Sequence, residues 1–543
     1  MGTDVKEGIS GMVQYAKSNR YALYVLFMCM MAYLVNQMNT FVVVATNTSM
    51  AQELQYGDRV CNATNATATA ILIAESHPNV TANIYCQQNN NLCDRNTTVC
   101  QWKYLGTGIL YQLLAGPLYI VLYAVSGIPL GMISELNNIN RKLILAICVI
   151  LWSVMTLLSG FSQAYWHVAV CRLALGIFGA GCVPFAASII AGYFEQSKRG
   201  AALGFFNWGI YVGYSISFLM LIAERNLGWR AVYFIAGAPG LAVGIIILIT
   251  VKDPEKEDDA DSEAALSKIK NTAGKLKRAC LVFLNPILLI LCLGGAIRNG
   301  AGIVWAYNIN NFFRFYHPGT RVEAWMSWIP LTFGSAGSFL GGVISDKFAR
   351  TRGPVGRLIV LIGSLLISAP FQVGTLFLPM PWAFISHIPA YLIGEMWIGV
   401  CLAVVVDLVP EDLRASSVAV YIFIIQMIGG NMNLMVTPLR QVLDLRYALL
   451  IGFPGSYVLG ALIFILTAFL LKKYRPHIQD DIDHAEIVVP PISEIPEKEN
   501  LAYNKDSGNG YATVTDIDTG IMPIERDNQA SPTKKRYIDP STL

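Results

Sequence analysis

Long apolar stretches recur along this chain and dominate what it can fold into. A helix needs roughly 20 mostly apolar residues to cross the hydrocarbon core of a bilayer, and twelve stretches come close to that length or exceed it. They cover residues 21–45, 105–133, 143–161, 167–194, 201–223, 230–251, 282–312, 324–345, 358–378, 382–409, 415–440 and 448–471. The first has no small-residue cleavage site, so we interpret it as a retained span. We predict an all-α polytopic membrane protein with 12 transmembrane helices.

Charged residues are concentrated between and after these stretches. Only 14% of the 543 residues are charged, and almost half of those fall within residues 252–278 and 472–543. The net charge of +3 contains no basic excess that would indicate a nucleic-acid partner. The segments predict two similar six-helix halves, a cytosolic linker and a disordered cytosolic tail. The predicted divisions are 1–20, 21–251, 252–281, 282–471 and 472–543.

The loop over residues 46–104 predicts the orientation of the chain. It holds every N-x-[ST] sequon, at Asn47, Asn62, Asn65, Asn79 and Asn96, and we predict glycosylation at the last four. It also holds four cysteines, Cys61, Cys86, Cys93 and Cys100. These predict two disulfides in an oxidising compartment and leave three pairings open, while the absence of a C-x-x-C pair argues against a metal site. The loop is therefore extracellular or lumenal, with both termini cytosolic, and a modest excess of Lys and Arg in the opposite short loops agrees.

Two short patterns in the tail indicate a sorting signal and a binding partner. Tyr511-Ala-Thr-Val514 resembles a tyrosine sorting signal, and the chain ends in Ser541-Thr542-Leu543, which a PDZ domain could bind by strand addition. The sequence leaves the plasma membrane and a lysosomal or endosomal membrane open.

Two motifs occur at matching places in both halves. Gly131-Met-Ile-Ser-Glu135 with Arg141 parallels Gly342-Val-Ile-Ser-Asp346 with Arg350, and the stretch around Arg199 parallels that around Arg414. Arg172-Leu-Ala-Leu-Gly176 opens the fourth span. Together these motifs and the six-plus-six arrangement resemble the major facilitator superfamily. A carboxylate at a helix end can pair with an arginine across the cytosolic seam, so we predict a latch formed by Glu135 with Arg141 and by Asp346 with Arg350. Arg199 and Arg414 are predicted to act in gating on the same side.

Within that superfamily the chain most resembles the spinster family of lysophospholipid and phosphorylated sphingoid-base transporters. The resemblance rests on 172–194, on Asn299–Ala306, on Ile393-Gly394-Glu395 and on Val404–Arg414. Two acidic positions of that family differ here. The first-span Asp-Arg pair is Asn39-Thr40, and the fourth-span glutamate falls on Gly179. An amide does not bind and release a proton at physiological pH, so we favour facilitated diffusion or another coupling ion over proton antiport.

Arg298 lies halfway along the seventh span in a glycine-rich stretch. A mid-membrane charge costs at least about 2.5–3.5 kcal/mol on insertion scales, so its presence needs a reason. We weigh three: binding of an anionic substrate group, pairing with Glu395, or snorkelling to the interface. Other candidate substrate-binding residues are Asn39, Thr40, Arg172, Tyr211, Trp305, Tyr307 and Glu395. For Arg172 we also expect a hydrogen bond to neighbouring backbone.

The leading hypothesis is a transporter of an amphipathic or organic anion, with a lysolipid among the candidates, that works by alternating access. No Walker, H-E-x-x-H or G-x-S-x-G motif is present, so we predict neither ATP-driven pumping, nor an enzyme, nor a cofactor. The expected partners are the lipid bilayer and a small-molecule or lipid substrate. The alternatives are a carrier of a small polar solute, such as a sugar, nucleoside or amino acid, and a transport-dead receptor.

Overall fold

The computed structural model describes residues 19–64, 82–94, 99–134, 139–254 and 273–488. The chain divides into two compact units, Met1–Ala485 and Glu486–Leu543. Every interaction reported below lies within the first unit. The predicted N-terminal segment, most of the linker and most of the tail, including the PDZ-type end and Tyr511, lie outside the described residues, so these predictions stay as they are.

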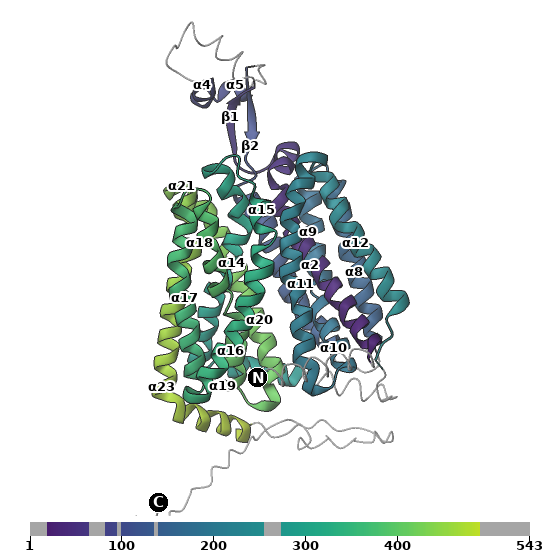
Figure 1. Ribbon diagram of the computed structural model, residues 1–543, viewed down its shortest axis with the longest axis vertical. Helices are drawn as coiled ribbons and strands as arrows, with labels where there is room; N and C mark the ends of the chain where they lie inside the picture. The colour runs from purple at the N-terminus through teal and green to yellow at the C-terminus, as the bar shows by residue number, and fades with distance from the viewer. Residues whose placement is uncertain (1–18, 65–81, 95–98, 135–138, 255–272, 489–543) are drawn as a thin grey trace, which may run out of the picture. The chain divides into compact units, whose positions relative to one another are not determined.

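The first half of the bundle contains helices that follow the first six predicted spans. Two of these spans are divided into two helices, one pair at Gly116 and the other at Ala180-Gly181. The helices are α2 (Arg20–Leu54), α6 (Ile109–Ala115), α7 (Pro117–Ser134), α8 (Arg141–Gly160), α9 (Tyr165–Gly179), α10 (Cys182–Tyr193), α11 (Gln196–Leu227) and α12 (Trp229–Thr250). Figure 1 shows α8, α9, α11 and α12 together on one side of the bundle.

The second half is more often interrupted, because prolines and glycines fall inside its apolar stretches. Its helices are α14 (Pro286–Tyr316), α15 (Val322–Met326), α16 (Ser335–Arg352), α17 (Pro354–Phe377), α18 (Trp382–Gly394), α19 (Ile398–Leu408), α20 (Arg414–Gly429), α21 (Val436–Leu443), α22 (Leu445–Leu450) and α23 (Ser456–Val488). Short turns η1 (Pro330–Gly334), η2 (Glu411–Leu413), η3 (Met432–Met435) and η4 (Ile451–Gly455) connect some of them.

Eleven helical stretches in the described part of the chain are long and apolar enough to cross a membrane. The predicted eighth span, 324–345, is not among them. Its main helix, α16, has only 18 residues and carries Asp346, Lys347, Arg350 and Arg352 near its end. The all-α membrane fold is confirmed, while the count of twelve spans remains a prediction.

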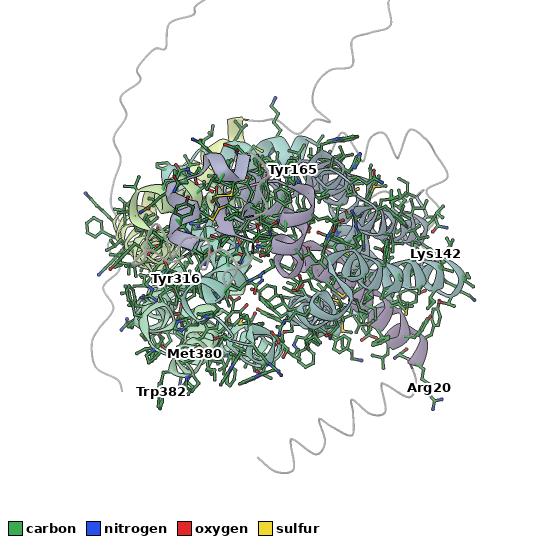
Figure 2. All side chains as sticks on the ribbon, turned by 90° about the horizontal axis from the view of Figure 1, so that it is seen from above. Arg20, Lys142, Tyr165, Tyr316, Met380 and Trp382 are labelled. Carbon is green, nitrogen blue, oxygen red and sulfur yellow. A yellow bond between two sulfur atoms is a disulfide. The ribbon has the colours of Figure 1, made fainter. Side chains whose placement is uncertain are left out.

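The outward-facing surface of the bundle is apolar, as a bilayer requires. Large hydrophobic side chains such as Ile249, Phe339 and Phe469 are 74%, 72% and 62% exposed. In the view from above in Figure 2, side chains fill the spaces between helices and also project outward; Arg20 and Lys142 lie at the edge of the first half, and Met380 and Trp382 at the edge of the second. Such an exposed apolar surface would be unstable in water.

The loop after α2 is built on a small disulfide-bonded hairpin. Strands β1 (Arg59–Ala63) and β2 (Cys100–Tyr104) pair antiparallel, with Cys61 opposite Trp102. Two short helices precede β2, namely α4 (Ala82–Gln88) and α5 (Asn91–Asp94). Disulfides join Cys61 to Cys93 and Cys86 to Cys100, so the prediction of two disulfides is confirmed and the pairing is resolved. Figure 1 shows the hairpin at one end of the bundle, which we call the loop end.

The sequons of the loop are not equivalent. Asn47, which is not among the predicted glycosylation sites, lies inside α2, is fully buried and donates a hydrogen bond to Asn311. Asn62 is half-buried on β1 and remains a predicted glycosylation site. Asn65, Asn79 and Asn96 lie outside the described residues.

Candidate functional site

Arg298 forms the centre of a polar site in the second half of the bundle. It lies in α14 and is 1% exposed. Its Nη2 donates to the carbonyl of Gly394 at 2.6 Å and lies 3.2 Å from Oε1 of Glu395. The Glu395 side chain is 21% exposed. The site therefore holds a deeply buried cation whose carboxylate partner is partly accessible.

The backbone break between α18 and α19 positions the partners of Arg298. The helix stops at Gly394 and resumes at Ile398, which frees the Gly394 carbonyl from the helical pattern. A Cβ at position 394 would lie 3.0 Å from Tyr457 Oη and 3.1 Å from Ser368 Oγ, so the tight approach here suits a glycine. The break also brings Trp397 to the site.

Two aromatic rings cover the guanidinium. The Arg298 Cζ atom lies 4.8 Å from the Trp397 ring centroid and 4.4 Å from that of Tyr457. Such cation–π contacts are worth about 2 kcal/mol when the cation is desolvated. The structure therefore shows the predicted pairing with Glu395. Snorkelling to the interface is wrong, because the charged end is held inside the bundle.

Arg172 forms the equivalent feature in the first half. It lies in α9, is 3% exposed, and its Nη1 donates to the carbonyl of Thr40 at 2.8 Å. The expected hydrogen bond to neighbouring backbone is thus confirmed. The Thr40 hydroxyl bonds the Asn36 carbonyl at 2.9 Å and Tyr119 Oη at 3.1 Å. Arg172, Thr40 and Tyr119 therefore form one chain of contacts between α2, α7 and α9.

Two asparagines beside this chain have unused hydrogen-bonding capacity. Asn36 and Asn39 are 0% and 1% exposed, and neither side chain has a hydrogen-bond partner within the described part of the chain. A Cβ added at Gly179, where the spinster pattern has a glutamate, would lie 2.9 Å from Asn36 Nδ2. The position of the missing carboxylate is therefore adjacent to Asn36.

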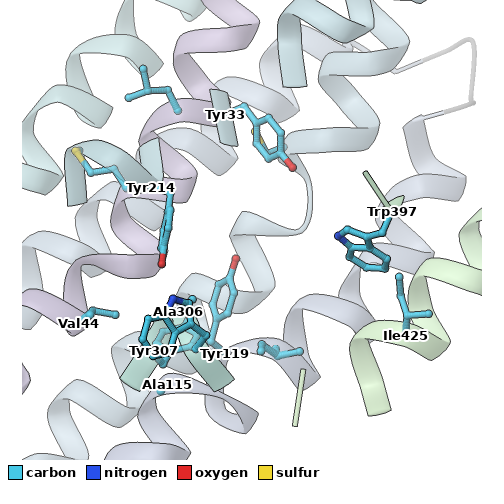
Figure 3. Close-up of a cluster of buried hydrophobic side chains, with 14 of the residues drawn as sticks. Tyr33, Val44, Ala115, Tyr119, Tyr214, Ala306, Tyr307, Trp397 and Ile425 are labelled. Atoms are coloured by element: carbon cyan, nitrogen blue, oxygen red, sulfur yellow. The ribbon is translucent and has the colours of Figure 1, made fainter. Parts of the chain in front are cut away.

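Aromatic side chains from both halves meet between the two polar clusters. Figure 3 shows the hydroxyl groups of Tyr33 and Tyr119 directed toward the same region, with Tyr214 on one side of it and Trp397 on the other. Phe41 packs against Tyr214 and Tyr307, with ring centroids 4.6 and 5.2 Å apart. This arrangement offers apolar faces near two guanidinium groups.

The predicted aromatic residues occupy different environments. Tyr211 is half-buried and meets Tyr391 at Gly334, where an added Cβ would lie 2.8 Å from one ring and 3.0 Å from the other. Trp305, by contrast, donates to His387 at 3.3 Å and stacks on Phe453 at 4.8 Å. Trp305 therefore packs within the second half, and Phe453 links it to Tyr457, with ring centroids 5.6 Å apart.

At the loop end, hydrogen bonds join the two halves. The side chain of Asn47 bonds that of Asn311 at 2.8 Å, and Gln112 bonds Asn308 at 2.9 Å. Arg440 lies 3.1 Å from Asp58, which precedes β1. The amide-rich run Asn308-Ile-Asn310-Asn311 in an otherwise apolar helix is the sequence signal for this contact, which was not predicted.

At the opposite end, the predicted ion pair is replaced by another. Asp346 pairs with Arg357 at 2.5 Å, and the same guanidinium pairs with Asp407 at 2.8 Å. The predicted partner of Asp346, Arg350, is exposed on α16. Arg357 was missed because it lies at the start of the next span, outside the repeated motif.

The other predicted gating residues have local partners. Arg199 donates to the Ala191 carbonyl at 2.8 Å, and Arg414 pairs with Glu411 at 3.1 Å within its own turn. Arg141 is buried, and its backbone N–H donates to Asp253 at 2.8 Å. Burial raises the pKa of the Asp253 carboxyl above its ordinary value. Glu135, the predicted partner of Arg141, lies outside the described residues.

A family model described as Major Facilitator Superfamily matches residues 25–432. The chain belongs to the major facilitator superfamily. Spinster homolog 1 of Xenopus laevis is 26% identical over 404 residues, which cover 65% of this chain and 74% of that protein. The probable galactarate/D-glucarate transporter GudP of Escherichia coli is 24% identical over 373 residues, covering 63% of this chain and 79% of that protein.

A solved structure shows the same fold. A bacterial homologue of the human lysosomal transporter Spinster, in an inward-facing and unoccupied conformation, superposes with a TM-score of 0.59 at 20% identity. The alignment covers 82% of this chain and 95% of that one. The major facilitator fold and the spinster-like relationship predicted from the sequence are both confirmed.

Proposed function

We propose that this major facilitator chain transports an amphipathic or organic anion by alternating access, with Arg298 holding the anionic group. One observation carries the proposal: a guanidinium that is 1% exposed has a carboxylate partner that is 21% exposed. Such a carboxylate can be displaced by a substrate anion without exposing the cation to the bilayer. The planar fork of an arginine suits carboxylate and phosphate groups equally.

Replacement of Glu395 by the substrate anion as the partner of Arg298 would couple substrate binding to a conformational change. The Nη2 atom is shared between Gly394 and Glu395, and Nε has no hydrogen-bond partner among the described residues. An incoming anion that bonds the guanidinium releases Glu395 from the α18–α19 break. A ligand shifts a conformational equilibrium only through such differential contacts.

The apolar part of the substrate would lie against the aromatic groups between the halves. The proposed lining comes from both halves. The first half contributes Asn39, Thr40 and Tyr211, and the second half contributes Tyr307. Trp397 and Tyr457 cover Arg298 from the second half. An amphipathic anion, including a lysolipid, matches this combination of one cation and several rings.

Alternating access needs contacts at each end that form in one state and break in the other. At the loop end these are Asn47–Asn311 and Asp58–Arg440. At the opposite end we propose the residues predicted for gating, with Arg357 added as the partner of Asp346. The proposed gating set is Glu135, Arg141, Asp346, Arg350, Arg199, Arg414 and Arg357.

Transport by this chain would not use the spinster family's acidic positions, because they are Asn39 and Gly179. We propose facilitated diffusion or coupling to an ion other than the proton. The loop end would face the extracellular or lumenal side, with the termini in the cytosol. The proposed location is the plasma membrane or a lysosomal or endosomal membrane, with a PDZ partner at the C-terminus.

Counterflow in proteoliposomes tests the proposal. Vesicles loaded with unlabelled lysophosphatidate or galactarate are exposed to the labelled compound, and uptake is compared with protein-free vesicles. Arg298→Ala should abolish uptake, Arg298→Lys should retain part of it, and Arg321→Ala, at an exposed position, should match the parent chain. Unchanged uptake by Arg298→Ala would contradict the proposal that Arg298 holds the anionic group of the substrate.

A carrier of a small polar solute is the second candidate, and the relationship to a galactarate/D-glucarate transporter favours it. In that case Arg298 binds a small carboxylate, or only Glu395, and the aromatic groups have a packing role. Galactarate exchange without lysophosphatidate exchange would select this candidate. A transport-dead receptor, suggested by the loop anchored through Asp58, would bind one of these compounds without exchanging either.

A further inference from the structure

Arg172 is a buried cation without a carboxylate partner in the described part of the chain. It is 3% exposed, and its Nη2 has no hydrogen-bond partner there, while Nη1 bonds only the Thr40 carbonyl. None of the described Asp or Glu side chains lies within 4.0 Å of its guanidinium nitrogens. Arg298, equally buried, has Glu395. The two halves therefore differ in how their central arginine is neutralised.

An uncompensated guanidinium at this depth is unfavourable. Charges within membrane spans almost always pair with one another or with backbone carbonyls. One carbonyl supplies a dipole and leaves the unit charge in place. The groups around Arg172 on α2 and α7, Thr40 and Tyr119, are neutral hydrogen-bonding groups. A negative charge near Arg172 Nη2 would stabilise the bundle.

The unused donors nearby match a small anion. Asn39 immediately precedes the residue whose carbonyl accepts from Arg172, and its amide has no hydrogen-bond partner in the described residues. Asn36, one turn earlier, has a free amide as well. Amide N–H groups and a guanidinium N–H are all donors, which is what a spherical anion accepts. Asn39 also occupies the position where the spinster pattern has an acidic residue.

We propose that a small inorganic anion, chloride under physiological conditions, binds between Arg172 Nη2 and the Asn39 amide. It supplies the counter-charge that a carboxylate at position 39 would otherwise provide. The anion makes the neutral residue Asn39 compatible with a buried Arg172. Chloride would then be a required or coupled ion, which deepens the proposed transport function and rests on it only for the transport readout.

Binding is tested first, without reference to any substrate. The full chain is purified in detergent and its thermal unfolding is followed in sodium chloride and in sodium gluconate at equal ionic strength. We expect the midpoint to rise by several degrees in chloride or bromide, because a ligand that binds the folded state stabilises it. Equal midpoints in chloride and gluconate overturn the proposal.

Variants locate the site. Arg172→Gln should lose the chloride effect because the cation is gone. Asn39→Asp should lose it as well, but with a gluconate midpoint at least as high as the parent's chloride midpoint, because the new carboxylate neutralises Arg172. Asn431→Asp is the control. It makes the same amide-to-carboxyl change at a site where the amide donates to the Met427 carbonyl, and chloride should still raise the midpoint of this variant. A chloride effect that survives in Arg172→Gln places the anion elsewhere and overturns the proposal.

A transport assay distinguishes chloride at the Arg172 site from the anionic group of the substrate. In the counterflow assay, replacing chloride by gluconate should reduce exchange by the parent chain several-fold and leave exchange by Asn39→Asp unaffected by the replacement. Stabilisation by lysophosphatidate or galactarate through Arg172, with none by chloride, would assign the site to substrate and overturn this proposal. A chain that binds chloride but exchanges neither compound would contradict the proposed function alone.

Discussion

The side-chain amide of Asn47 on α2 donates a 2.8 Å hydrogen bond to the side-chain oxygen of Asn311 on α14. Both asparagines are buried, at 0% and 1% exposure, and they belong to opposite halves of the bundle. A buried amide pair of this kind holds the two halves together at the loop end without placing a charge there. Opening at that end must separate the two side chains.

Asn311→Ala should therefore favour opening at the loop end. A typical hydrogen bond contributes about 1 kcal/mol, so the open population should rise about five-fold. Spin labels at the exposed loop-end residues Trp166 and Val442, on a Cys280→Ser background, report the separation by pulsed electron spin resonance. Asn299→Ala removes a side-chain hydrogen bond to Gln426, which lies within the second half, and should leave the distance distribution unchanged. If the distance distribution broadens in both variants, the effect comes from lost packing and not from the Asn47–Asn311 hydrogen bond.

The pairing of Arg298 with Glu395 predicts a strongly non-additive response to mutation. Removing one partner of a buried pair costs about 3–5 kcal/mol, because the other charge stays buried, whereas replacing both by apolar residues is often neutral. Glu395 is partly exposed, so Glu395→Leu should fall at or below the lower end of that range. Arg298→Met combined with Glu395→Leu should recover most of the loss in a thermal-unfolding assay. Additive losses would show that the two side chains act independently in the fold.

The sequence was sufficient for the fold, because apolar length and repeated motifs report directly on membrane spans and halves. It also selected Arg298 and Glu395, since an ionisable residue in a span is rare. It could not find Trp397, Tyr457 or Arg357, because their roles depend on how α17, α18, α19 and α23 pack. The choice among three disulfide pairings likewise depended on how α5, which carries Cys93, lies against the hairpin strand that carries Cys61.

The two disulfides should contribute unequally to the loop. They close segments separated by 32 residues for Cys61–Cys93 and 14 for Cys86–Cys100. Loop-closure entropy predicts about 4 and about 3 kcal/mol of stabilisation, respectively. The double variant Cys61→Ser/Cys93→Ser should be cut in the loop faster by a protease than Cys86→Ser/Cys100→Ser, with the thermal midpoint of the bundle little changed in both. The reverse order of cleavage would contradict the entropic argument.

Gly179→Glu should give the chain a proton-dependent step. The added Cβ would lie 2.9 Å from Asn36 Nδ2, which is the end of a side chain that can move, and 3.8 Å from Tyr119 Oη. The new carboxyl group can therefore be accommodated, with Asn36 as a hydrogen-bond donor. Two turns of α9 separate it from Arg172, about 10 Å along the axis.

Gly176→Glu tests the steric argument behind this variant. Its Cβ would lie 2.5 Å from the Tyr119 carbonyl oxygen, which is backbone and cannot move away, so this chain should be poorly folded. An imposed pH gradient should change the initial rate of exchange in Gly179→Glu proteoliposomes several-fold and should not affect the parent chain. A parent chain that already responds to the gradient would show that protons are carried by groups other than the two lost carboxylates, with Glu395 the first to examine.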